Sequence, residues 1–521
     1  MPADPTPAES LANMPSRIGE VVAPWAARAP ERPAIFDNGR SWTYGALAEA
    51  IHALRNWLIE KHVRPGDRVM VVNENCATVI GLLLAIADLD AWSILVSARL
   101  SDREIDEIYE HSEARRIIYT VDASPQTMAL ALRRGAMVER IPRAGTLALS
   151  PLNPAALPQP VEADPARQVA ALVYTSGTTG HPKGVMLTHR NLLFMARVSG
   201  LMRQLGPEDR FFAVLPISHI VGLAVVVLGT LLHGGSISLC SRFSPASALN
   251  ALVEDRVTIM LGVPPMYGLL AEYAALRGLE SLSHPALRAI GACGAPLDPS
   301  IKAATERLFG MPLHNGYGIT ECSPTISQTR LDEPQNNCSV GRVLPGVEVK
   351  LIGRDGVAVG GSDVGEIRVR GPNVMLGYYK AAGETAAVID AEGWFNTHDL
   401  GRMEGGQLFI VGRTKELIIR SGFNVYPAEI EAVLNAHPAV LQSAVVGRPG
   451  GGDEGIIAFV QLVSGIKASA AELAAFATRE LAPYKRPTEI VLVDTLPAGS
   501  AGKIRKSELG PLLVNLAARQ A

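Results

Sequence analysis

The segment 174–185 brings together residue types that can hold phosphate groups. It reads Y-T-S-G-T-T-G-H-P-K-G-V, and residues 169–174 are apolar enough for a short buried strand. Glycine lets the backbone approach an anion closely, while backbone N–H groups and hydroxyls donate hydrogen bonds to it. We therefore predict a polyphosphate-binding loop that contains Thr175, Ser176, Gly177, Thr178, Thr179, Gly180 and Lys183.

The order of these residues differs from that of a P-loop. A P-loop has a glycine, four further residues and then Gly-Lys-Ser or Gly-Lys-Thr. Here Lys183 follows Pro182, precedes Gly184 and has no serine or threonine after it. For this segment alone, a polar surface loop rich in turn-forming residues is the alternative.

Five further segments place a reactive or charged side chain in or beside a glycine turn or at the end of a strand-like stretch. In chain order they contribute a histidine, a Thr-Glu pair, an aspartate, an arginine and a lysine. The segments are 215–219, 316–321, 396–399, 412–417 (continued by 421–427) and 497–503.

Together with the loop 174–185, these segments resemble the motifs of the adenylate-forming superfamily of acyl-CoA synthetases, adenylation domains and luciferases. The resemblance covers nearly the whole chain, the six motifs follow the family order, and the chain looks most like an acyl-CoA synthetase. It implies that ATP, Mg²⁺ and a carboxylic acid give acyl-AMP and pyrophosphate, after which the thiol of CoA displaces AMP. An acyl-AMP ligase that loads a carrier protein remains an alternative.

The resemblance also implies roles for individual residues around the nucleotide. Glu321 would bind Mg²⁺, a hard cation that prefers oxygen ligands, and Thr320 would donate to the α-phosphate. His219 would lie at the acid carboxylate, with a packed core histidine as its alternative. The ribose would contact Asp399 and Arg413, and the adenine would lie between Gly294, Ala295 and Pro296 on one side and Asn315, Gly316 and Tyr317 on the other.

Two half-reactions at one site require a part that moves. By resemblance, Lys503 would bridge the attacking carboxylate and the α-phosphate as a mobile point charge, and the C-terminal domain would then rotate about Lys415. The thiol arm of CoA would then pass Ser421, Gly422 and Phe423. The pattern around Lys503 also resembles a site for protein acetyltransferases, and acetylation would remove its charge.

One position departs from the family pattern. The family has Thr-Gly-Asp where this chain has Thr397, His398 and Asp399. The aspartate remains, so we expect ribose binding, while the imidazole adds bulk beside the nucleotide.

The acid pocket is predicted from four segments, 218–223, 262–267, 291–294 and 315–319. They contain no arginine or lysine, so a second carboxylate on the substrate would lack a partner. They also lack an aspartate that could pair with an amino group. Apolar walls favour a fatty or aryl acid, and the sequence leaves that choice open.

The elements that position these motifs alternate between strands and helices. Apolar runs at 67–72, 116–119, 258–262 and 289–292 read as buried strands, and 77–88 and 220–232 as helices. Short strands with Gly, Pro and Asp turns between 337 and 411 indicate an antiparallel, barrel-like unit. We predict a layered α/β N-terminal domain over 1–414 and a small mobile α+β domain over 415–521.

Composition limits the remaining function classes. A net charge of −3 in 521 residues, without a long basic run, disfavours a nucleic-acid partner. No signal peptide or stretch long enough to span a bilayer is visible. Five cysteines without a C-x-x-C pair favour a reducing compartment, so we expect a cytoplasmic protein.

Two other function classes stay open as rivals. A kinase or ATPase would also use a phosphate loop, but would release ADP rather than AMP. A non-catalytic acyl- or nucleotide-binding protein is the second, and the presence of both Glu321 and Lys503 speaks against it.

Overall fold

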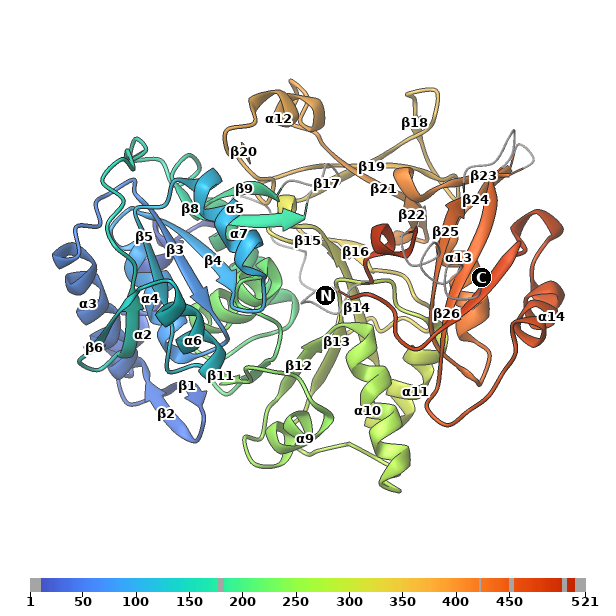
Figure 1. Cartoon of the computed structure of the whole chain (residues 1–521), viewed down its shortest axis with the longest axis horizontal. Coiled ribbons are helices and arrows are strands. Elements are labelled where there is room, and N and C mark those ends of the chain that lie inside the picture. The colour runs from blue at the N-terminus through green and yellow to red at the C-terminus, as the bar shows by residue number, and fades with distance from the viewer. Residues whose placement is uncertain (1–10, 177–181, 421–422, 449–453, 499–503, 511–521) are drawn as a thin grey trace.

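A computed structural model describes residues 11–176, 182–420, 423–448, 454–498 and 504–510. It shows two large sheets in the N-terminal part, a smaller antiparallel sheet after them and a small α+β unit near the C-terminus (Figure 1). The predicted fold class, a large layered α/β part followed by a small α+β part, is therefore confirmed.

The first large sheet has eight strands and carries the phosphate-loop segment. Its central strands are parallel, and the chain of β8 turns back as β9 in an antiparallel hairpin. The order across the sheet is β20 (Gly377–Tyr378), β9 (Pro182–Thr188), β8 (Val169–Ser176), β4 (Trp92–Ser97), β3 (Arg68–Asn73), β5 (Arg116–Tyr119), β7 (Gly145–Leu149) and β6 (Met137–Ile141).

The second large sheet has nine strands, and its middle strands are also parallel. The strand order is β16 (Arg342–Val343), β15 (Thr325–Gln328), β14 (Leu313–Gly318), β13 (Ala289–Ala292), β12 (Ile259–Gly262), β10 (Arg210–Ala213), β11 (Ser236–Leu239), β1 (Pro33–Asp37) and β2 (Arg40–Thr43).

The N-terminal part has five layers: the two sheets, one layer of helices between them and one layer of helices on the outer face of each sheet. Alternate side chains of each strand face different helix layers. Val69 and Val71 of β3 and Ile259 and Leu261 of β12 share one apolar core with helices between the sheets, α4 (Ala77–Ala87), α7 (His189–Met202) and η2 (Val221–Leu228). The intervening residues of β3 face α5 (Asp102–Ser112) and α6 (Pro125–Arg133). Those of β12 face α9 (Pro245–Val253), α10 (Pro264–Leu276) and α11 (Pro299–Phe309). Strands buried on both faces explain the continuous apolar runs in the sequence.

Hydrogen bonds at the start of α7 fix the helix beside the phosphate-loop hairpin. Thr188 accepts from the backbone N–H of Asn191, whose side chain accepts from Thr188 N–H in return, so the pair forms a capping box. Asn191 Nδ2 also donates to the carbonyls of Pro372 and Val374, at 2.7 and 2.9 Å. These bonds hold the segment that leads into β20 against α7.

The antiparallel unit predicted between 337 and 411 is a five-stranded sheet. Its order is β18 (Ala358–Val359), β17 (Glu348–Ile352), β19 (Gly365–Arg370), β21 (Phe395–Glu404) and β22 (Gln407–Arg413). Neighbouring strands in this sheet pair antiparallel. The prediction of short antiparallel strands in this region is confirmed.

Among its described residues, the C-terminal unit has two small sheets and the helices α13 (Pro427–Asn435) and α14 (Ala470–Glu480). Strands β23 (Ile418–Arg420) and β24 (Phe423–Val425) form a hairpin, and β25 (Val440–Arg448), β26 (Gly455–Leu462) and β27 (Glu489–Val493) form the other sheet. Helices α13 and α14 pack on it through a separate apolar cluster. Because this cluster contains only residues after 417, the unit has a core of its own.

Candidate active site

One buried carboxylate, itself a predicted ribose ligand, contacts both the other predicted ribose ligand and the predicted adenine segment. Asp399 on β21 is 3% exposed. Its Oδ1 lies 2.9 Å from Arg413 Nε on the neighbouring strand β22, and its Oδ2 accepts a hydrogen bond from the hydroxyl of Tyr317 at 2.6 Å. The register of β21 and β22 places Asp399 directly opposite Arg413. Three residues from three of the predicted motifs therefore meet at one point.

Burial and charge set the protonation of this cluster. Burial raises the pKa of Tyr317 well above its usual range, and the Asp399 carboxylate raises it further. Burial lowers the pKa of Arg413, but Asp399 together with Glu416 and Tyr317 outweighs it, so the net shift is upward. Tyr317 thus stays a neutral hydrogen-bond donor and Arg413 a cation, which leaves Asp399 fixed from two sides.

A second cluster lies beside the phosphate-loop hairpin. The hydroxyl of Tyr378 donates to Glu321 Oε1 at 2.9 Å, and Lys183 Nζ lies 5.1 Å from the centre of the Tyr378 ring. Lys183 also forms an ion pair with Glu384 in α12 (Ala382–Val388). The pairing of β20 with β9, with Tyr378 opposite Val185, creates this arrangement. Lys183, a member of the predicted phosphate-loop motif, thus packs against the tyrosine that holds Glu321.

The phosphate-loop hairpin itself is described in part. Thr175 lies opposite Lys183 and Ser176 opposite Pro182, so the two strands close around the loop tip. The predicted strand before the loop is confirmed as β8. Gly177, Thr178, Thr179 and Gly180 lie outside the described residues. The element after the loop is a strand, whereas a P-loop is followed by a helix.

The remaining predicted residues of the N-terminal part lie in turns at strand ends. Thr320 and Glu321 form the 3₁₀ turn η3 (Thr320–Cys322) after β14. His219 is exposed in the turn before η2, so the alternative of a packed core histidine is wrong. Gly294, with φ of 80°, begins the turn 294–296 after β13. Asn315 Nδ2 is 3.3 Å from the carbonyls of Cys338 and Ser339, so its side chain holds a neighbouring loop.

His398 has a left-handed backbone, with φ of 57°. Glycine adopts that conformation freely and other residues rarely do. The imidazole Nδ1 lies 3.3 Å from Glu366 Oε1, and the Thr414 hydroxyl donates to the same carboxylate at 3.3 Å and to the His398 carbonyl at 3.2 Å. The imidazole is therefore engaged by Glu366 on β19, next to the predicted hinge.

The structure describes only part of the C-terminal motifs, together with the residues on either side of them. Lys415 lies in the 3₁₀ turn η4 (Thr414–Glu416), and Phe423 pairs with Arg420 across the β23–β24 hairpin. Ser421, Gly422 and Lys503 lie outside the described residues. On either side of the Lys503 loop, Ala498 and Ile504 form a bridge.

Lys506 ties the described residues that follow Lys503 to the turn η4. Its Nζ lies 3.0 Å from Glu416 Oε2 and 2.8 Å from Glu431 Oε1 on α13. Burial lowers the pKa of Lys506, but the two carboxylates outweigh it, so the net shift is upward and the ammonium stays charged. Lys506 is thus anchored to Glu416, the residue that follows the predicted hinge Lys415.

A narrow pocket lies along the nine-stranded sheet beside the nucleotide motifs. It includes parts of two of the predicted acid-binding segments, 291–292 and 315–316. The predicted segments themselves contain no arginine or lysine, and Arg203 lines this pocket from the end of α7, outside those segments. The lining residues are Arg203, Ile259, Met260, Leu261, Ala289, Ile290, Gly291, Ala292, His314, Asn315, Gly316, Gln328, Thr329 and Leu331.

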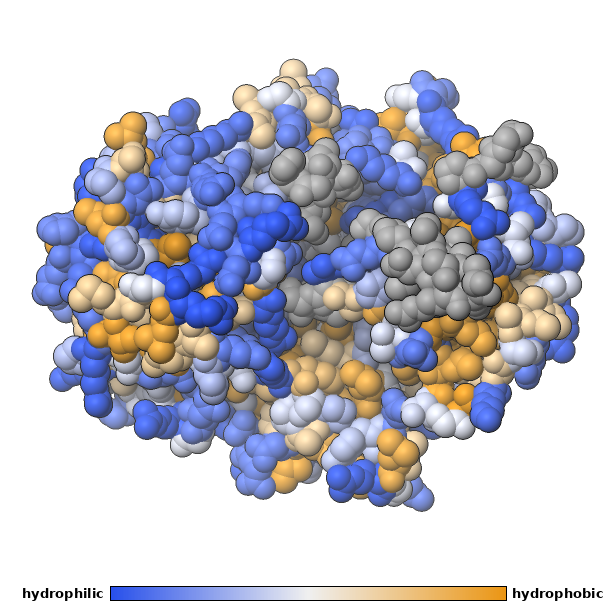
Figure 2. Space-filling model, in the orientation of Figure 1, coloured by the Kyte–Doolittle hydropathy of each residue, from blue (hydrophilic) through white to orange (hydrophobic). Residues whose placement is uncertain are grey.

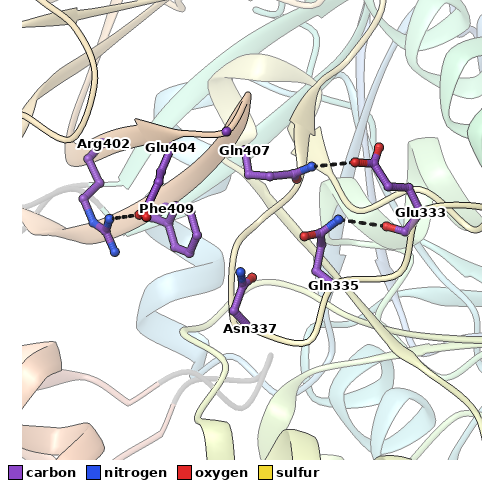
Figure 3. A pocket seen from close by; sticks show the side chains of 8 residues that line it. Glu333, Gln335, Asn337, Arg402, Glu404, Gln407 and Phe409 are labelled. Carbon is purple, nitrogen blue, oxygen red and sulfur yellow. Dashed lines mark hydrogen bonds and ion pairs between the residues drawn. The ribbon is translucent and has the colours of Figure 1, made fainter.

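A separate, more open pocket lies on the five-stranded sheet (Figure 3). Its lining is polar, and Glu333 accepts hydrogen bonds from Gln407 and, through its carbonyl, from Gln335. None of the predicted site residues lines it. Hydrophobic residues instead gather in the lower middle of the face in Figure 2, where Figure 1 places β12, β13 and α10.

Sequence reasoning missed Tyr378, Glu384, Arg203 and His314. Tyr378 is 57 residues from Glu321 in the chain, so only the pairing of β20 with β9 reveals their contact. The one sequence feature that could have indicated His314 is its position directly before the predicted adenine segment.

Neither a closed metal site nor a membrane-spanning helix is found in the described residues. They contain no group of three or more His, Cys, Asp and Glu side chains that could hold a metal ion. None of their helices is long and apolar enough to cross a bilayer. The five cysteines are free thiols.

Comparison with known proteins defines the class of this chain. The family model of the AMP-binding enzymes matches residues 22–379, and that of the AMP-binding enzyme C-terminal domain matches 429–503. The chain belongs to this family and is an acyl-CoA synthetase of the adenylate-forming superfamily, an AMP-forming acid–thiol ligase.

Relatives of known activity cover nearly the whole chain. A feruloyl-CoA synthase of Amycolatopsis sp is 34% identical over 93% of this chain and 96% of its own. A sulfoacetate–CoA ligase of Cupriavidus necator is 34% identical over 94% and 97%. The solved o-succinylbenzoate coenzyme A synthetase from Bacillus subtilis, in complex with ATP and magnesium ion, is 28% identical over 94% and 99%, with a TM-score of 0.79.

Proposed function

We propose that this protein joins an apolar carboxylic acid, fatty or aryl, to CoA through an acyl-AMP intermediate, with ATP and Mg²⁺. One observation carries the proposal: β14 contributes to both the nucleotide cluster and the acid pocket. Tyr317 of this strand bonds Asp399, while His314, Asn315 and Gly316 line the pocket. An acid in the pocket and a nucleotide at Asp399 would therefore lie at neighbouring positions along one strand.

The proposed roles follow the charges that the reaction must neutralise. A carboxylate has to attack the α-phosphorus of an anionic triphosphate, so donors and cations must face both groups. We assign the ribose to Asp399 and Arg413, and the α-phosphate to Thr320. His219 and Lys503 would face the attacking carboxylate, and the loop 175–180 the outer phosphates.

Glu321 fits a magnesium ligand. Its Oε1 accepts from Tyr378, while within the described residues its Oε2 has no hydrogen-bond partner and can take a cation. A single protein carboxylate suits Mg²⁺, which is commonly held by one or two carboxylates and the phosphates of its substrate. When bound, the ion would offset negative charge on the phosphates. Tyr378 keeps Glu321 oriented, because burial and Glu321 both raise the tyrosine pKa and keep it a donor.

The C-terminal unit would serve the second half-reaction. We propose that the mobile domain begins at 415, that Lys415 is the hinge and that Ser421, Gly422 and Phe423 line the path of the thiol. Its separate core supports movement as one body. We also propose a cytoplasmic location and control by a protein acetyltransferase at Lys503, on the sequence pattern alone.

A substrate panel tests this function. Fatty and aryl acids are incubated with ATP, Mg²⁺ and either CoA or a phosphopantetheinylated carrier protein, and AMP, pyrophosphate and thioester are measured separately. We expect acid-dependent AMP and a CoA thioester with at least one acid. Thioester formed only on the carrier protein would assign the second step to a carrier, and ADP as the product would contradict the proposal.

A further inference from the structure

Arg203 is a half-buried cation without an acidic partner. It follows α7, and among the described residues the one hydrogen bond of its side chain runs from Nη1 to the carbonyl of Ser199 at 3.2 Å, with no carboxylate paired to it. No aspartate or glutamate lines the pocket that it enters. A guanidinium has five N–H donors, so most of its donor capacity is unused. Burying a charge without a partner is costly, which raises the question of what this arginine binds.

The sheet register shows how the pocket is shaped in front of Arg203. Leu261, Gly291 and His314 are direct neighbours across the parallel strands β12, β13 and β14. Gly291 has no side chain, and a Cβ built there would lie 3.0 Å from Leu261 Cδ1. Leu261 therefore packs against Gly291 on the apolar side of the row, and His314 forms its polar side.

The polar side can add hydrogen bonds to the positive charge. Burial lowers the pKa of His314 to about 4, and the neighbouring Arg203 contributes. A neutral imidazole still donates one hydrogen bond, and His314 Nδ1 lies 3.2 Å from the Thr329 hydroxyl. Burial also lowers the pKa of Arg203, to about 10, so the guanidinium remains charged near neutral pH.

We propose that Arg203, with His314, binds a second anionic group on the acid substrate, a carboxylate or sulfonate at the end opposite the activated carboxylate. This inference rests on the proposed ligase function and narrows its substrate class. Tyr317, at the nucleotide, lies three residues beyond His314 on β14, or about 10 Å along an extended strand. The substrate is thus an acid with a short apolar body between two acidic ends.

A structural role is the competing explanation for Arg203. A cation at a helix C-terminus interacts favourably with the helix dipole, and the bond to Ser199 fits that role. The bond to Ser199 uses only one of the guanidinium donors, however. A structural role also does not explain why the side chain lines a pocket. Arg277, which follows α10 in the same position, offers a matched control because it is absent from the pocket lining.

The test compares matched acids on one protein preparation. Acid-dependent exchange of pyrophosphate into ATP is measured for octanoate against suberate and for cinnamate against 4-carboxycinnamate. We expect at least one diacid to have a kcat/KM about tenfold or more above its matched monoacid. In Arg203→Met the ratio of the diacid kcat/KM to the monoacid kcat/KM should fall about 10- to 100-fold, the effect of one charged hydrogen-bonding contact. It should stay unchanged in Arg277→Met.

Using a ratio makes the result independent of how much of each variant folds. Arg203→Lys, which keeps the charge and loses the planar fork, should give an intermediate ratio. Monoacids preferred in both pairs, or an equal ratio in Arg203→Met and the unmodified protein, would overturn the inference and leave the ligase function intact. Exchange with no acid at all would instead overturn the proposed function, and this inference with it.

Discussion

Replacing Lys503 by alanine is expected to lower the rate of acyl-AMP formation about 10²- to 10³-fold, the usual cost of one electrostatic contact to a transition state. The lysine would neutralise charge between the carboxylate and the α-phosphate, which is needed only in the first half-reaction. Thioester formation from supplied acyl-AMP should therefore remain largely intact. Acid-dependent pyrophosphate exchange measures the first step, and CoA thioester release from purified acyl-AMP measures the second.

The matched control for Lys503 is Lys467→Ala, which removes an exposed lysine from the same C-terminal unit. It should leave both half-reactions unchanged. An equal loss of both half-reactions in Lys503→Ala would show that the residue supports the fold or the whole site, and would remove its assignment to adenylation.

Asp399→Asn is expected to lower kcat/KM for ATP about 10²-fold. The amide keeps the shape of the side chain but removes the charge that pairs with Arg413, and it cannot accept hydrogen bonds at both positions. Losing hydrogen bonds from an ionised group costs more than losing neutral ones. Exchange rates measured over a range of ATP concentrations show the effect, while the KM for the acid should change little.

A remote ion pair provides the control for Asp399. Asp90 Oδ1 lies 2.7 Å from Arg17 Nε in another part of the N-terminal domain. Asp90→Asn should leave the dependence on ATP unchanged. If Asp399→Asn kept a normal KM for ATP, the cluster of Asp399, Tyr317 and Arg413 would hold the fold together without binding the ribose.

The strands and helices around the site could be predicted because their residues carry a strong local pattern. The apolar run at 116–119 and the helix-like spacing at 77–88 correspond to β5 and α4. Both lie inside a layered fold where strands are buried on both faces, so hydrophobicity alone identifies them. Local sequence therefore located these two elements to within a residue.

The contacts between motifs could not be predicted in the same way. The bond from Tyr317 to Asp399 joins residues 82 positions apart and depends on how the nine-stranded and five-stranded sheets meet. Arg203 was missed for a related reason: the acid pocket was assembled from segments after strands, whereas this side chain comes from the end of a helix between the sheets. Topology, not residue type, decides such contacts.

The central claim is that the protein forms an acyl-AMP before any thiol takes part. The most direct measurement is the exchange of labelled pyrophosphate into ATP with Mg²⁺, in the presence and absence of the acid, without CoA. The account predicts exchange that requires the acid and no ADP, followed by net AMP release when CoA is added. Exchange without the acid, or ATP turnover that yields ADP, would contradict it.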